Sequence, residues 1–133
     1  MRASFHNMGI ETNRNALVYS LIEGISFGLF DNYQALSKTG IKLNNLFVIG
    51  GGSKNEDWIK LLASILNRDL AITEASDAMA AYGAARLAYL GYNNLKHEEL
   101  LKPPAVKKII EKDNNLSPLL QERFAQWKSH YVK

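Results

Sequence analysis

The chain has 133 residues, of which 47% are hydrophobic and 22% charged, a composition typical of one globular domain. It contains no cysteine, which excludes disulfides and thiolate metal sites and fits a reducing compartment. The net charge of +3 comes from 16 basic and 13 acidic residues spread along the chain, so we expect no nucleic-acid partner. No apolar run approaches the roughly 20 residues that span a bilayer, so we expect no membrane partner.

Residues 13–39 are predicted to form one long helix, with Thr12 as its N-cap and Gly40 just beyond its end. Large apolar side chains recur there at three- and four-residue spacing, which is the pattern of a helix that buries one stripe. The expected stripe comprises Leu17, Val18, Leu21, Ile22, Ile25, Leu29, Tyr33 and Leu36.

Two short strands and two helices are expected to follow. The apolar run at 45–49, NLFVI, predicts a buried strand, and a helix is expected over 54–66. A second strand is expected at 70–73, LAIT, and a second helix over 78–90 with Asp77 as its N-cap. This alternation predicts an α/β fold that contains a parallel pair of strands.

The C-terminal part is expected to contain an extended segment and one more helix. The extended segment is AVKKII, residues 105–110. The helix is expected to begin with Ser117 as its N-cap and Pro118 at its first position. Its apolar stripe would consist of Leu120, Phe124, Trp127 and Tyr131.

Three consecutive glycines, Gly50, Gly51 and Gly52, lie between the first predicted strand and the helix after it. Ser53 and Glu56 have the S-x-x-E spacing of a capping box, which indicates a defined helix N-terminus. Such a terminus offers unpaired amides and a partial positive charge, and glycine lets a ligand lie against the main chain. The combination suits a nucleotide or a phosphate. Glycine also occurs in such turns for geometry alone, and neither a P-loop nor the spaced dinucleotide fingerprint is present.

Four segments together resemble the C-terminal part of the FGGY family of carbohydrate kinases, especially its xylulokinase- and gluconokinase-like members. They are RASF, LIEGISFGL, VIGGGSKNEDWIKLLASIL and AYGAARLAYLGY, which occur in this order over almost the whole chain. The resemblance implies an α/β fold that is part of a ribonuclease-H-like, actin-type ATPase domain, with short parallel strands and flanking helices. It implies that residues 1–133 are the C-terminal portion of the ATP-side domain.

The resemblance also implies a function. Family members transfer a phosphoryl group from ATP, with Mg²⁺, to a sugar, here most simply xylulose or a related pentulose, in the cytoplasm. By motif position, nucleotide contacts fall on Gly51, Gly52 and Ser53, with Asn55 and Glu56 as further contacts.

Other parts of the family's machinery are not expected in this chain. The general base of the family is an aspartate upstream of the region covered here, and none of Asp31, Asp57, Asp69 or Asp77 stands in that motif. We therefore expect no catalytic residue, a sugar substrate only in the full-length enzyme, and no turnover by this chain alone. The three histidines are scattered, so we expect no metal site.

Two alternatives stay open at this point. The chain could be a stand-alone interaction or structural module that keeps the fold without catalysis. A chaperone- or actin-like ATPase relative would share the architecture, but it would not predict the pair EGISF and GGGSKNEDW. A partial domain would also expose apolar surface, so a homo-oligomer is a reasonable expectation.

Overall fold

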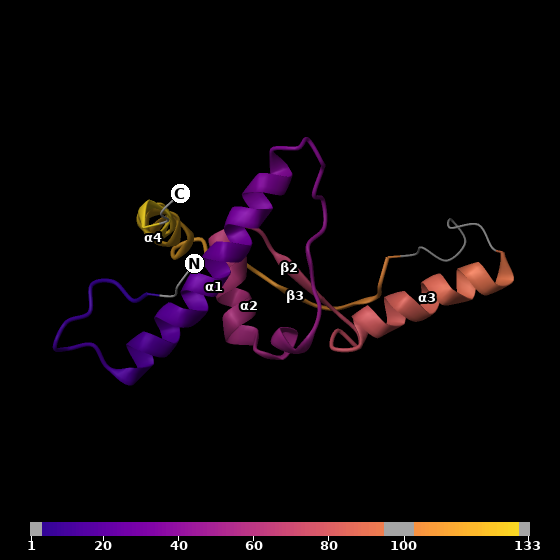
Figure 1. Cartoon of the computed structure of the whole chain (residues 1–133), viewed down its shortest axis with the longest axis horizontal. Coiled ribbons are helices and arrows are strands. Elements are labelled where there is room, and N and C mark those ends of the chain that lie inside the picture. The colour runs from indigo at the N-terminus through magenta and orange to yellow at the C-terminus, as the bar shows by residue number, and fades with distance from the viewer. Residues whose placement is uncertain (1–3, 95–102, 131–133) are drawn as a thin grey trace.

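The structure is a computed structural model that describes residues 4–94 and 103–130 (Figure 1). The residues that it describes form four α-helices, one 3-10 helix and three strands. In chain order they are α1 (Arg14–Ser37), β1 (Phe47–Val48), η1 (Gly51–Lys54, the 3-10 helix), α2 (Glu56–Leu66), β2 (Leu70–Thr73), α3 (Met79–Asn93), β3 (Val106–Ile110) and α4 (Ser117–Ser129).

The three strands form one small sheet in the order β1-β2-β3. β1 is parallel to β2, with Phe47 opposite Ala71. β3 is antiparallel to β2, with Ile110 opposite Leu70. The predicted parallel pair and the predicted extended segment at 105–110 are thus confirmed, whereas the antiparallel pairing of that segment was not predicted.

α2 is the centre of the fold because it contributes to both hydrophobic clusters. One side of α2 packs with α1 and α4, and its other side packs on the sheet. This is the arrangement expected when two layers share one amphipathic helix. The first cluster contains Phe27, Phe30, Leu61, Ile65, Leu120 and Phe124, and the second contains Ile59, Leu62, Ala63, Leu70, Ile72 and Ile110.

The face of α1 that enters the core is not the predicted stripe. The buried residues of α1 are Glu23, Ser26, Phe27 and Phe30. Most of the predicted stripe is exposed instead, and only Ile22 and Tyr33 from that stripe pack at the margin of the first cluster. The periodicity correctly predicted that this segment is a helix with an apolar stripe. However, α2 and α4 pack against the side of α1 opposite that stripe.

Several helix starts also differ from prediction. Asn13, not Thr12, caps α1, because its Oδ1 accepts a hydrogen bond from the Ala16 amide at 3.0 Å. α4 does begin at Ser117, but Leu116 is the N-cap residue and Ser117 Oγ donates to the Asp113 carbonyl. Gly40 has the positive φ (84°) expected after a helix. Tyr131, the last residue of the predicted stripe of α4, lies outside the described residues.

A buried ion pair joins α4 to α1. Arg123 Nη2 donates to Glu23 Oε2 at 2.7 Å, and the Glu23 side chain is only 6% exposed whereas that of Arg123 is 42% exposed. Burial raises the pKa of Glu23, and the nearby Arg123 guanidinium and the Tyr19 hydroxyl oppose this rise. The charged form of the Glu23 carboxylate is therefore destabilised by burial and stabilised mainly by the single guanidinium of Arg123.

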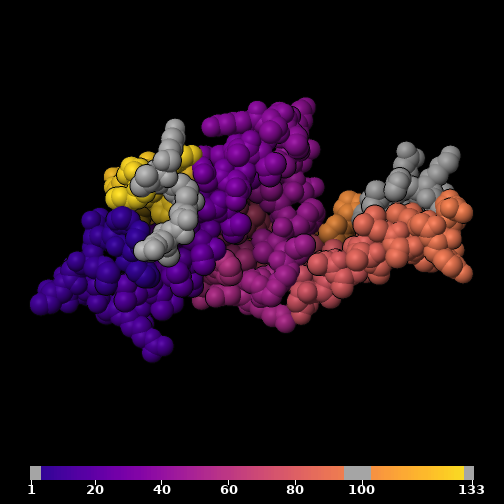
Figure 2. All heavy atoms as spheres, in the orientation of Figure 1, coloured from indigo at the N-terminus to yellow at the C-terminus, as the bar shows by residue number. Residues whose placement is uncertain are grey.

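α3 extends away from the body formed by α1, α2, α4 and the sheet (Figures 1 and 2). It begins at Met79 and continues through the predicted end at 90 to Asn93, where Asn94 adopts a left-handed conformation with φ of 47°. Among the residues that the structure describes, none of the helices combines the length and apolar character that crossing a bilayer requires.

Candidate functional site

The glycine segment turns the chain from β1 into η1, and Gly50 makes the turn possible. Its φ of 88° and ψ of 178° lie in a region that only glycine occupies without strain. Its amide donates to the carbonyl of Ser76 at 2.7 Å, which joins the turn to the loop between β2 and α3.

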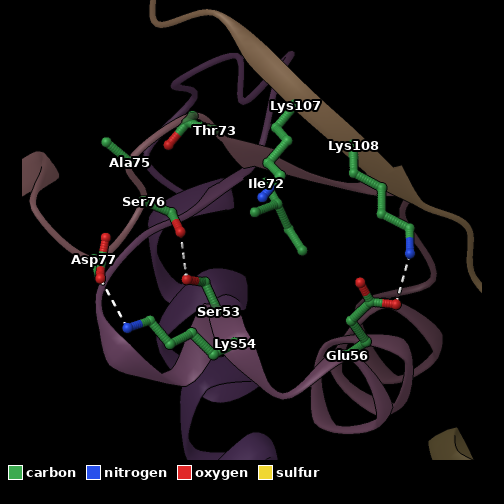
Figure 3. Close-up of a pocket in the computed structure, with 10 residues that line it drawn as sticks. All are labelled: Ser53, Lys54, Glu56, Ile72, Thr73, Ala75, Ser76, Asp77, Lys107 and Lys108. Carbon is green, nitrogen blue, oxygen red and sulfur yellow. Dashed lines mark hydrogen bonds and ion pairs between the residues drawn. The ribbon is translucent and has the colours of Figure 1, made fainter.

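The Ser53 side chain links the glycine turn to the loop after β2 through hydrogen bonds. This side chain is buried, its Oγ donates to the Gly50 carbonyl at 2.7 Å, and it lies 2.6 Å from Ser76 Oγ (Figure 3). The single hydroxyl donor of Ser53 is therefore used by the Gly50 carbonyl. The Ser53 amide donates to the same carbonyl at 3.1 Å, so neither donor of Ser53 is free for a ligand.

The predicted capping box is wrong. η1 displaces the start of α2, so Asn55 is the N-cap and its Oδ1 accepts from the Trp58 amide at 3.1 Å. Glu56 turns toward β3 instead, where Lys108 Nζ pairs with its Oε2 at 2.6 Å (Figure 3). The carboxylate is thereby partly neutralised by a lysine. Asp57 lies in the first turn of α2, as predicted.

Gly51 and Gly52 have different surroundings. A Cβ placed on Gly51 would meet no atom within 4 Å, so this residue presents open main chain. A Cβ on Gly52 would lie 2.9 Å from the ring of Trp58, whose Nε1 donates to Ser26 Oγ at 2.9 Å. The amides of both glycines precede the first hydrogen bond of η1, from Ser53 to Gly50, so the helix does not use them.

We expect Gly52→Ala to lower the unfolding free energy by about 1 kcal/mol, because the Trp58 ring must shift and strain its bond to Ser26. Gly51→Ala is the matched control, and its effect should stay within about 0.5 kcal/mol. Urea unfolding followed by tryptophan fluorescence measures both. Equal stabilities of the two variants would contradict the close contact.

A hollow of about 430 Å³ lies beside the turn, bounded by η1, the start of α2, the end of β2, the loop after β2, and β3 (Figure 3). Of the five predicted nucleotide contacts, Ser53 and Glu56 line it, whereas Gly51, Gly52 and Asn55 do not. The lining residues are Ser53, Lys54, Glu56, Ile72, Thr73, Ala75, Ser76, Asp77, Lys107 and Lys108.

Four of the charged side chains that line this hollow form two ion pairs, Lys54 with Asp77 and Lys108 with Glu56. Lys54 Nζ lies 2.8 Å from Asp77 Oδ2, and this hydrogen-bonded pairing lowers the pKa of Asp77 and raises that of Lys54. Asp77 was predicted to cap α3, but α3 has no side-chain cap and the carboxylate binds Lys54 instead. Within the described ranges, no cluster of acidic or histidine side chains could hold a metal ion.

Sequence reasoning missed Ser76 and Lys108. They lie 23 and 52 residues along the chain from their partners Ser53 and Glu56. Neither has a local pattern that signals a contact. The register of β3 on β2 brings Lys108 near the start of α2. This register is set by tertiary packing and not by the local sequence.

Comparisons with known proteins agree on one family. Residues 1–92 match the sequence model of the C-terminal domain of the FGGY family of carbohydrate kinases. A xylulose kinase of Staphylococcus xylosus is 31% identical over 91 residues, which are 68% of this chain and 19% of that protein. A xylulose kinase of Escherichia coli (strain K12) is 35% identical over 79 residues, which are 59% of this chain and 16% of that protein.

Solved structures extend the similarity to nearly the whole chain. A crystal structure described as a xyloylose kinase from Brucella ovis has a TM-score of 0.87 and 32% identity, covering 98% of this chain and 27% of that one. A xylulose kinase from Rhodospirillum rubrum, at 19% identity and a TM-score of 0.79, shares the fold over 96% of this chain.

The chain belongs to the FGGY family of carbohydrate kinases, as the match over residues 1–92 shows. The predicted fold class is confirmed as well, because its structural neighbours are sugar kinases of the ribonuclease-H-like, actin-type fold. The chain spans between 16% and 27% of the length of the relatives described above.

Proposed function

We propose that the chain forms the nucleotide-binding side of the cleft in a sugar kinase that phosphorylates xylulose or a related pentulose. The observation that carries this proposal is the open main chain at Gly51, the first residue of η1, shortly before α2 begins at Glu56. The Staphylococcus xylosus and Escherichia coli relatives are xylulose kinases, which supports the choice of sugar.

The residues of the turn fit a phosphate-bearing nucleotide. Gly51 and Gly52 offer amides that η1 leaves unused, and the N-terminus of α2 adds a partial positive charge. Ser53 would border the nucleotide and hold the turn rather than donate to a phosphate, since its amide and its hydroxyl both donate to the Gly50 carbonyl. Asn55 would border the nucleotide from the N-cap position, and Lys108 would limit repulsion between Glu56 and the phosphates.

Mg²⁺ would arrive with ATP rather than on a site of this chain, given that the described residues contain no acidic cluster for it. When bound, Mg²⁺ neutralises phosphate charge during phosphoryl transfer. That reaction depends on positioning by both walls of a cleft. We therefore propose that this chain alone binds nucleotide weakly and has no turnover, and that the sugar binds only in a full-length kinase in the cytoplasm.

Titration of the ¹⁵N-labelled chain with Mg-ATP, followed by NMR, tests the proposal. We expect the amides of residues 50–57 to shift and added xylulose to shift none. Gly51→Ala should weaken ATP binding roughly five-fold, because its methyl group would obstruct one amide–phosphate hydrogen bond worth about 1 kcal/mol.

The matched control is Gly28→Ala on α1, where an added Cβ also meets nothing within 4 Å. Its affinity for ATP should equal that of the unaltered chain. Shifts confined to residues far from the turn, or equal affinities for the two variants, would overturn the nucleotide assignment. Sugar-dependent ATP consumption by the chain would overturn the proposed inactivity.

A further inference from the structure

The outward side of α1 carries a long row of exposed apolar side chains. Val18, Leu21, Ile25, Leu29 and Leu36 are each between 45% and 54% exposed. At about 1.5 Å per residue, the row from Val18 to Leu36 is roughly 27 Å long. We call these five residues the α1 stripe.

The α1 stripe is separate from the core of the described structure. At about 100° per residue, its members fall on the side of α1 away from Phe27 and Phe30, which face α2 and α4. A row of this size and regularity is unusual on the surface of a monomer and marks a place where another layer packs. The helix is thus apolar on two sides, and the described elements cover one of them.

The comparisons indicate what covers the other side. α1 lies within residues 1–92, the part that matches the family, and the Brucella ovis chain superimposes on 98% of this one. This chain covers only 27% of that kinase, so roughly three quarters of such a fold has no counterpart here. Helices in a layered α/β domain are covered by further layers of the same fold.

We propose that the α1 stripe is the docking surface for the remaining portion of an FGGY kinase, which packs against it as a further layer. The occupant is an apolar face of that portion, supplied by the same polypeptide or by a separate one. A second copy of this chain is the competing occupant. The proposal concerns packing and does not depend on nucleotide binding at the glycine turn.

The absence of cysteine from the chain permits a direct test by thiol labelling. Leu21→Cys and Ile25→Cys place single thiols in the α1 stripe, and Leu119→Cys is the control, because Leu119 is 50% exposed on α4. Each variant is studied as the isolated chain and as a chimaera in which residues 1–133 replace the matching quarter of the Brucella ovis kinase. Labelled peptides are quantified by mass spectrometry after a timed pulse of a thiol reagent.

We expect the two stripe thiols to react at least about ten-fold more slowly in the chimaera than in the isolated chain, because a packed layer must open before the reagent enters. The control thiol should react equally fast in both. If the chimaera does not fold, the kinase lacking its matching quarter is co-expressed with this chain, and the same comparison is made on the pair.

Unchanged labelling of the stripe thiols in the folded assembly, or failure of both assemblies to form, would overturn the proposal. Protection already present in the isolated chain, together with a dimer by light scattering, would instead identify a second copy as the occupant. Stripe protection without ATP binding would leave this inference standing while the nucleotide proposal fails.

Discussion

Leu120→Ala should lower the unfolding free energy by about 2–5 kcal/mol, since Leu120 is completely buried where α4 packs on α1 and α2. The loss combines the transfer of the apolar side chain with the cavity that remains beside Phe27 and Phe124. Urea or thermal unfolding monitored by circular dichroism measures this effect.

Leu119→Ala is the matched control on the same helix. Leu119 is half-exposed, and the substitution has the same chemistry, so its effect should stay within about 0.5 kcal/mol. If the two variants were equally stable, α4 would not be part of the cooperative core, and the packing described above would be wrong.

The second large effect is expected from Arg123→Leu, which leaves the buried carboxylate of Glu23 without its cation. We expect a loss of about 2–3 kcal/mol at pH 8. This is less than the about 3–5 kcal/mol for a fully buried pair, because Arg123 is partly exposed and the pair is partly screened.

The loss should shrink at low pH. Burial already raises the pKa of Glu23 above its ordinary value of 4.5, and Arg123 opposes that rise. Without Arg123 the folded-state pKa rises further, so the folded protein binds the proton more tightly than the unfolded chain does. A group of this kind contributes stability below its unfolded pKa and loses it as pH rises through the folded pKa. The penalty should therefore be smallest at or below pH 4.5 and should grow as the pH rises through the raised folded-state pKa of Glu23.

Two further variants isolate the cause. Lys128 lies on α4, like Arg123, and its exposed ion pair is with Asp31 of α1. Lys128→Leu removes that pair and should cost less than about 1 kcal/mol at every pH. Adding Glu23→Gln to Arg123→Leu should restore part of the stability at pH 8, because no charge is then buried. A pH-independent loss in Arg123→Leu would mean that the arginine acts only through packing.

Local pattern was enough to predict those elements whose packing agrees with their own periodicity. The strand at 70–73 and the helix after Ser117 are found as expected, because an apolar run and an N-terminal proline specify them locally. The parallel pairing of the first two strands followed from the order of elements. The α1 stripe shows the limit of such reasoning, because periodicity locates apolar residues and leaves open what covers them.

The site shows the same limit. The glycine turn could be predicted from three glycines between a strand and a helix. The capping pattern misled because η1 intervenes, with the turn joined to Ser76, a residue that is distant in sequence. The partner of Glu56 depends on the register of β3, which no local rule supplies.

The position of α2 has a consequence for where this folding unit can be cut. The match to the family ends at residue 92, yet Ile110 closes one side of α2, and Leu120 and Phe124 close the other. A polypeptide trimmed at residue 92 would keep every family motif and lose part of the interior on both sides of its central helix. The physical boundary of the unit therefore lies beyond the boundary drawn by sequence likeness, and any excised version needs residues through at least Phe124 to keep both sides of α2 covered.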